Sequence, residues 1–239
     1  MAPLAFLLMS ALAQVAEPAP AREAPADNFK PDPAWKSLGP SLWFDPKGRT
    51  LVLRARVVLR EGPLEHLLCL KGTKEHEAIL STPAVPKQIH AGLLLTGAEP
   101  GHPVRFVPKF EPPAGTPIGI ELVWDEDGKT RRADAREWVF DERKKIPLKT
   151  DWVFAGSELV TDPVSKKPFY AADEGDLITV ANFANAILDL PFASTANDAD
   201  RSFVARTERI PPRGTGVTLF LRPRAAARTV PKPAKSESR

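Results

Sequence analysis

The sequence predicts a mainly β fold: one antiparallel sandwich or barrel-like domain with one or two short helices. The chain has 239 residues and 26 prolines, and proline removes a backbone donor and interrupts helices. Residues 51–60 alternate between apolar side chains and mostly polar ones, which is the pattern of a strand with one buried face. Turns that contain glycine and proline separate such segments, as in proteins built from short strands.

The first part of the domain is predicted to form neighbouring strands. Turn residues at 46–48 precede the strand at 51–60, and residues 42–44 are its expected partner. A second turn follows at 61–63, after which residues 64–71 are expected to return as a third strand. In this third strand His66 lies on an apolar face, where a histidine that belongs to the core or to a sheet edge is typical.

A second hairpin and one helix are predicted farther along the chain. Residues 118–124 and 129–139 flank an acidic turn that ends in Gly128, which is typical of a hairpin. The helix is expected over residues 86–95, because proline suits a first helical turn and Gly97 suits the stop. Further short strands are expected at residues 152–155, 169–171, 177–181, 203–205 and 217–221.

Both ends of the chain are predicted to lie outside the globular domain. Residues 1–16 contain an apolar run of signal-peptide length, without lysine or arginine before it, which predicts export to the periplasm or to the outside of a bacterial cell. Residues 17–34 are rich in proline and alanine and are expected to be a flexible linker. Residues 35–222 are the predicted β-rich domain, and residues 223–239 are a basic tail expected to be disordered.

Charge is distributed unevenly along the chain. The net charge is +3, but the stretch from Arg222 onward is so basic that residues 1–221 are slightly acidic. The predicted domain therefore lacks the basic stripe of a nucleic-acid-binding protein, and no nucleic-acid partner is expected. The tail is expected either to make weak contact with an anionic cell-envelope surface or only to improve solubility.

Reactive side chains concentrate between Cys69 and His90. The segment 69–77 holds a thiol, lysines, carboxylates and an imidazole, and His90 follows on the predicted helix. Cys69 is the single cysteine, which excludes an intramolecular disulfide and every motif that needs paired cysteines.

This segment also carries a family resemblance. Residues 69–80 (CLKGTKEHEAIL), 89–95 (IHAGLLL), 152–157 (WVFAGS) and 210–212 (IPP) occur in this order, with Gly97 and Pro100-Gly101 between them. Together they resemble the YdjY-domain family of exported bacterial proteins, over roughly residues 45–222. The resemblance implies one domain with the Cys69–His90 segment as its hallmark, and it implies no activity. The matching positions include Glu75, His76, Glu77 and His90, to which the resemblance gives no role.

Two chemical hypotheses are open for this segment. The first is a transition-metal site formed by Cys69, His76 and His90 with Glu75 or Glu77, all of which are ligand types that such ions accept. Their spacing matches no standard metal motif, since Leu rather than His follows His76 four residues later. The second is thiol catalysis, in which His76 or His90 would activate Cys69.

The third hypothesis requires no reaction and is the one we adopt from the sequence. The chain is interpreted as a non-catalytic binding or interaction module, and no cofactor is identified beyond the metal ion of the alternative hypothesis. Its expected ligand pocket is polar and is formed by Lys74, Glu75, His76, Glu77 and His90. In this interpretation Cys69 is a small core residue.

Overall fold

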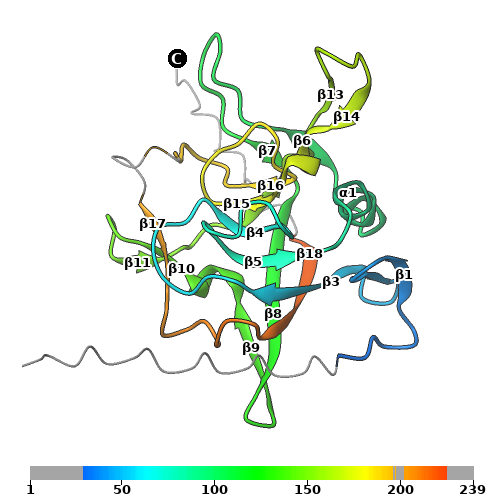
Figure 1. The fold of residues 1–239 in the computed structure, drawn as a ribbon, viewed down its shortest axis with the longest axis vertical. Helices are drawn as coiled ribbons and strands as arrows, with labels where there is room; N and C mark the ends of the chain where they lie inside the picture. The colour runs from blue at the N-terminus through cyan, green and yellow to red at the C-terminus, as the bar shows by residue number, and fades with distance from the viewer. Residues whose placement is uncertain (1–28, 196, 198–201, 225–239) are drawn as a thin grey trace, which may run out of the picture.

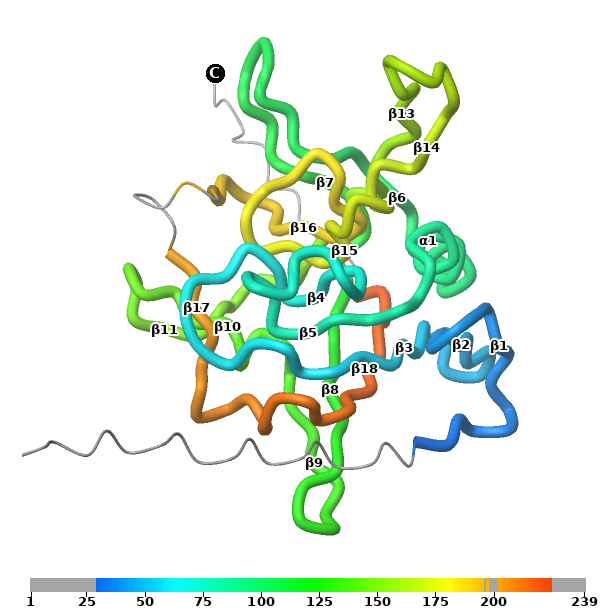
Figure 2. Tube along the Cα trace, in the orientation of Figure 1, coloured from blue at the N-terminus to red at the C-terminus, as the bar shows by residue number. Residues whose placement is uncertain are grey.

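Eight strands close into a barrel-like sheet (Figures 1 and 2). The structure is a computed structural model, and it describes residues 29–195, 197 and 202–224. Around the barrel the order is β3-β18-β8-β12-β16-β15-β4-β5, and β5 pairs back to β3. Their bounds are Thr50–Val57 (β3), Gly216–Pro223 (β18), Pro117–Glu126 (β8), Trp152–Phe154 (β12), Leu188–Asp189 (β16), Asp176–Thr179 (β15), His66–Leu70 (β4) and Ala78–Thr82 (β5).

Shorter elements extend the barrel or lie against it. From β3 the sheet continues to β2 (Leu42–Asp45) and β1 (Lys36–Gly39), and β9 (Lys129–Asp134) pairs with β8. The helical elements are α1 (Pro86–Leu95), η1 (Ala135–Trp138) and η2 (Ala171–Glu174). Three small sheets contain β6 (Pro100–His102) with β7 (Ala114–Gly115), β13 (Leu159–Thr161) with β14 (Pro168–Tyr170), and β10 (Val139–Asp141) with β11 (Ile146–Pro147) and β17 (Phe203–Ala205).

The predicted mainly β, barrel-like domain with a short helix is confirmed. Strand β3, the β8–β9 hairpin and α1 lie where the sequence places them, with Pro86 in the first turn of the helix. The barrel encloses a continuous apolar core, in which Trp138, Trp152 and Phe154 are among the largest fully buried side chains. The apolar surface that this domain removes from water therefore comes from large side chains on many short strands rather than from long helices.

Two adjacent strand pairs differ from the expected antiparallel arrangement. Strand β4 runs parallel to β5, and β15 runs parallel to β16. Residues 64–71 therefore do not fold back on β3 as expected, because β4 pairs with β15 and β5 instead. The loop of residues 71–77 must return from the end of β4 to the level at which β4 begins. This return brings the residue before β5 next to the residue before β4.

At its N-terminal end the domain begins before the predicted boundary. The predicted signal peptide and nearly all of the basic tail lie outside the described residues. Phe29 packs against Trp43, with ring centroids 5.3 Å apart. The Arg54 guanidinium lies over the ring of Phe29. The chain thus contacts the domain six residues before the predicted boundary at residue 35. No helix in the described ranges is long and apolar enough to cross a membrane.

Candidate functional site

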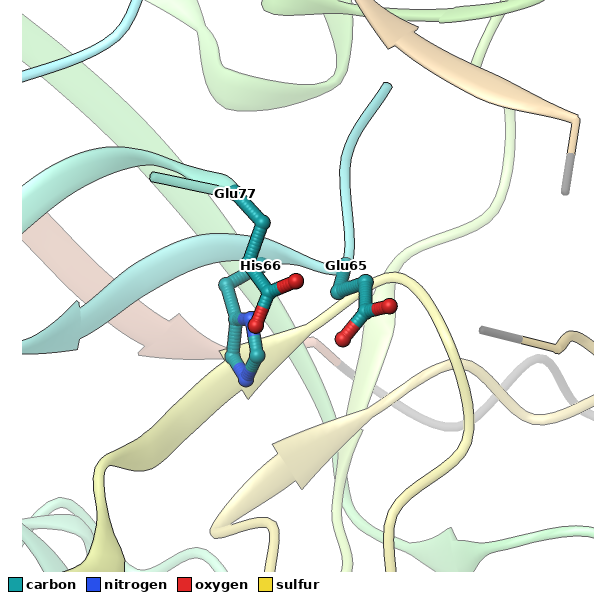
Figure 3. Close-up of side chains that lie close together, drawn as sticks. All are labelled: Glu65, His66 and Glu77. Atoms are coloured by element: carbon teal, nitrogen blue, oxygen red, sulfur yellow. The ribbon is translucent and has the colours of Figure 1, made fainter. Parts of the chain in front are cut away.

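Two carboxylates and an imidazole converge at the start of β4 and β5. One potential ligand atom each of Glu65, His66 and Glu77 lies within 4.8 Å of the others, and no second group of this kind occurs among the described residues. Figure 3 shows the two carboxylates turned toward the imidazole. Glu65 is 9% exposed, His66 is fully buried, and the Glu77 side chain is 15% exposed. The cluster therefore has little contact with water.

The local backbone explains how consecutive residues contribute to one cluster. The amide groups of Glu65 and His66 both donate to the carbonyl oxygen of Glu77, each at 3.1 Å. Two residues of one strand thus oppose a single residue of its neighbour, as in a β-bulge, and a bulge redirects side chains that would otherwise alternate between faces. The parallel register aligns His66 with Ala78, so the preceding residues Glu65 and Glu77 are level as well.

Of the two ring nitrogens of His66, only Nε2 contacts a hydrogen-bond partner in the described chain, and that partner is a buried carboxylate. Its Nε2 lies 2.7 Å from Oδ1 of Asp176, which is buried on β15. Because a carboxylate accepts, Nε2 is the donor in this contact, and in the neutral imidazole Nδ1 is then left with a lone pair. Nδ1 is buried and has no hydrogen-bond partner in the described chain. In metal centres a histidine usually binds the ion through one ring nitrogen and donates the N–H of the other to a carboxylate.

The donor set suits a divalent transition metal. Imidazole nitrogen and carboxylate oxygen are ligands of Zn²⁺, Mn²⁺ and Fe²⁺. Ligand atoms about 2.0–2.2 Å from a tetrahedral ion are about 3.3–3.6 Å from one another, and the three atoms here lie within 4.8 Å of one another. Rotation of the Glu65 and Glu77 side chains would adjust their spacing to an ion, while the bond to Asp176 keeps the imidazole in place.

The segment after β15 covers the imidazole. The ring of Phe183 stacks on His66, with centroids 5.3 Å apart and planes 17° apart. The amide of Phe183 donates to Oδ2 of Asp189, and the Asn182 side chain donates to Oδ1 of the same carboxylate, both at 3.2 Å. Burial is the largest influence on Asp189, and it raises the pKa of this carboxyl to about 7 despite these donors. A buried carboxylate therefore positions the aromatic cover of the site.

Cys69 lies in the core rather than in a reactive pocket. It is fully buried on β4, opposite Ser81 of β5 and Asp176 of β15. Burial raises the pKa of its thiol to about 12, so the thiol is protonated at neutral pH, and a thiolate is the reactive form. The position fits the expected role as a small core residue.

The side chains that precede Glu77 in the loop of residues 71–77 do not join the buried cluster. The Glu75 carboxylate accepts a hydrogen bond of 3.2 Å from the amide of Gly72, which closes the turn. Lys74 is half-buried, whereas the side chain of His76 is 75% exposed, with Nε2 3.7 Å from Oε2 of Glu77. His76 thus points outward from the same loop that carries Glu77 inward.

His90 contacts a separate group of residues. Its Nδ1 lies 3.0 Å from the carbonyl oxygen of Gly156 and 2.8 Å from the hydroxyl of Tyr170, and its ring packs edge-on against Phe154. Burial, which outweighs the bond to Gly156, lowers the pKa of His90. The ring joins α1 to the turn after β12, and its partners include none of residues 74–77.

The structure brings together only part of the predicted site. Of the five residues expected to line a ligand pocket, Glu77 belongs to the buried cluster. Cys69, His76 and His90 do not come together as a group of metal ligands, because the first is in the core, the second faces solvent and the third faces Gly156. His66 was interpreted as a core histidine and Glu65 was not singled out. The available signal was that Glu65 and Glu77 each directly precede a strand, and that His66 is the first residue of one.

The position of Cys69 leads to a test of thiol reactivity. We expect iodoacetamide to leave the folded protein unmodified at neutral pH and to modify Cys69 readily in denaturant, because the thiol is buried and its pKa is raised. Mass spectrometry before and after unfolding measures both states. Rapid alkylation of the native protein would contradict this placement of Cys69 and would revive thiol catalysis.

Comparison with family models gives a match that covers most of the chain. The match is to the model of the YdjY domain, over residues 42–222. Searches of curated proteins and of solved structures find no match. The matched range contains all eight barrel strands up to Arg222 and the Glu65, His66 and Glu77 cluster. The chain belongs to the YdjY-domain family.

Proposed function

We propose that this protein is an exported, non-catalytic binding module that holds one divalent transition metal ion. Glu65, His66 and Glu77 are the proposed ligands, and Zn²⁺ and Mn²⁺ are the ions that fit two carboxylates and one imidazole best. The observation that carries the proposal is the convergence of His66 with two carboxylates, together with a buried His66 Nδ1 that has no hydrogen-bond partner in the described chain.

The electrostatics of the cluster favour a cation. The carboxylates of Glu65 and Glu77 lie near the His66 imidazole, and that of Asp176 contacts it. Removing carboxylates from water is costly unless an opposite charge compensates them. A divalent ion would supply that charge, and it would also give Nδ1 the partner that it lacks.

A binding role accounts for the geometry better than a catalytic one. Catalytic metal sites keep a coordination position open to substrate, whereas this cluster is nearly dry and Phe183 covers its imidazole. The thiol of Cys69 is buried and protonated, which removes the reactive group that the sequence offered. Export is proposed from the apolar run within residues 1–16.

The test is a titration of metal-depleted protein with Zn²⁺ and with Mn²⁺ by calorimetry. We expect one equivalent to bind, and we expect Glu77→Gln to weaken binding by at least about 100-fold, since loss of a group that only orients a ligand already costs about 10- to 100-fold. Gln keeps the size of the side chain and removes its charge. His76→Ala is the control from the adjacent position, and because His76 only approaches the Glu77 carboxylate at 3.7 Å, it should weaken binding far less than Glu77→Gln.

Two outcomes would contradict this site. If His76→Ala and Cys69→Ser abolish binding while Glu77→Gln retains it, the metal centre is the one formed by Cys69, His76 and His90. If the folded wild-type protein binds neither ion, the metal proposal fails altogether. Far-UV circular dichroism of each variant separates a lost ligand from a lost fold.

A further inference from the structure

Large apolar side chains are exposed on two projections of the domain. The first is the loop of residues 103–113 between β6 and β7, where Phe106 is 58% and Val107 is 83% exposed. The second is the β13–β14 hairpin, where Leu159 is 74% and Val164 is 89% exposed. Figures 1 and 2 show both rising from the same end of the molecule. Exposed apolar groups that cluster in this way mark interaction surfaces.

The first projection is braced, so its apolar tip is held away from the body. Arg105 and Glu111 exchange backbone hydrogen bonds of 3.0 and 2.8 Å, and their side chains form an ion pair at 2.9 Å. Between them the rings of Phe106 and Phe110 pack against each other, with centroids 6.1 Å apart. The loop therefore ends in a convex apolar knob rather than in a segment that folds back onto the core.

The bases of the two projections are packed together. Gly156, just before the β13–β14 hairpin, approaches Pro100 at the start of β6 so closely that a Cβ there would lie 3.0 Å from the Cβ of Pro100. Gly115, at the end of the first projection, lies against the carbonyl of Phe154 with no room for a side chain. These contacts fix where the two projections leave the barrel.

Lysines without partners accompany the apolar side chains. Lys109 lies at the tip of the first projection, and Lys166 and Lys167 lie in the hairpin turn. None of these three forms an ion pair within the described part of the chain. Two acids of the projections are engaged elsewhere, since Glu111 pairs with Arg105 and the Asp162 carboxylate accepts from backbone amides of its own turn.

We propose that the two projections form a docking surface for an anionic lipid bilayer. A convex apolar knob suits a deformable interface, where Phe106, Val107 and Val164 would enter the boundary between headgroups and acyl chains. The three lysines would remain at the level of the anionic headgroups, which attract basic side chains near the surface. This proposal does not rest on the metal site.

Cosedimentation with vesicles tests the proposal. The protein is used without residues 1–16, because that apolar segment would itself bind lipid and because the core cluster extends only from Leu42 to Leu221. We expect the wild type to partition onto vesicles of phosphatidylcholine with phosphatidylglycerol, and more weakly onto phosphatidylcholine alone. The double variant Phe106→Ser/Phe110→Ser should partition about tenfold less onto both. The variant Lys166→Glu/Lys167→Glu should lose about tenfold on the anionic vesicles only.

Matched controls come from other parts of the surface. Ile146→Ser removes an apolar side chain that is 39% exposed on β11, and Lys129→Glu reverses an exposed lysine at the β8–β9 hairpin, which Figure 1 shows at the opposite end of the molecule. Both should partition nearly as the wild type does. The proposal is overturned if the wild type binds neither vesicle, which would indicate a protein partner instead, or if the controls lose as much binding as the tip variants.

Discussion

Between about pH 4 and pH 8, the wild-type protein is expected to lose up to about 4 kcal/mol of stability relative to an Asp189→Asn variant. Asp189 is fully buried on β16, and burial raises the pKa of its carboxyl from 3.8 to about 7. Between these pH values the folded state holds a proton that the unfolded state has released. The free energy of unfolding therefore falls as pH rises through this window, and it is independent of Asp189 outside it.

The difference between the two proteins isolates this one group. Five other carboxylates have lowered pKa values, which makes stability rise with pH and would obscure the effect in the wild type alone; they are Glu121, Asp134, Asp141, Asp162 and Glu208. Asparagine keeps the shape of the side chain but cannot ionise. It also places a donor near the amide of Phe183, which adds an offset that does not vary with pH.

Urea denaturation at several pH values measures this prediction, because the slope against pH rather than the absolute stability carries the result. A difference between wild type and Asp189→Asn that stays constant from about pH 4 to pH 8 would show that Asp189 ionises normally in the folded state. Since the same carboxylate accepts from the amide of Phe183, whose ring stacks on His66, such a result would also show that this side of the site is in contact with water rather than buried.

Trp152→Ala is expected to lower the free energy of unfolding by about 3–5 kcal/mol. Trp152 is fully buried on β12 and is one of the largest side chains of the core. Its Nε1 donates a 2.7 Å hydrogen bond to the carbonyl oxygen of Thr179, the last residue of β15. The substitution would leave a large cavity and would also remove the link between β12 and the segment that covers His66.

Two further variants keep this prediction measurable if the alanine variant does not fold. Trp152→Phe retains most of the volume and removes the indole donor, so we expect a loss of about 1–2 kcal/mol by urea denaturation. Trp43→Ala truncates a half-buried tryptophan on β2 and should cost less than Trp152→Ala, since less of its surface is taken from water on folding. Equal losses at positions 43 and 152 would contradict the central place of Trp152 in the core.

The sequence predicted those elements that local patterns determine. Alternation of apolar and polar residues predicted β3 and β8, turn residues predicted the β8–β9 hairpin, and Pro86 with Gly97 marked the limits of α1. These features depend on residues a few positions apart, so periodicity and turn chemistry are sufficient to find them. The family resemblance was likewise carried by short motifs in order, and the family match confirmed it.

The candidate site could not be predicted in the same way. Both faces of β4 are buried, so the alternation that assigns a face to each residue gives no indication that His66 is special. The sequence instead drew attention to Cys69, His76 and His90, which are close along the chain and contain the most reactive groups. Their actual surroundings, the core, solvent and the Gly156 turn, depend on packing partners that are distant in the sequence.

The sequence by itself therefore determined the strand content, the helix, the hairpin and the family of this protein. Only the tertiary structure decided that β4 and β5 run parallel, which sets Glu65 and Glu77 at one level, and that Asp176, more than 100 positions after His66, orients its imidazole. The physical reason is that strand direction and long-range pairing are set by which apolar faces close the barrel together. That choice depends on how apolar faces from distant parts of the domain pack together, and it leaves no mark in any short segment.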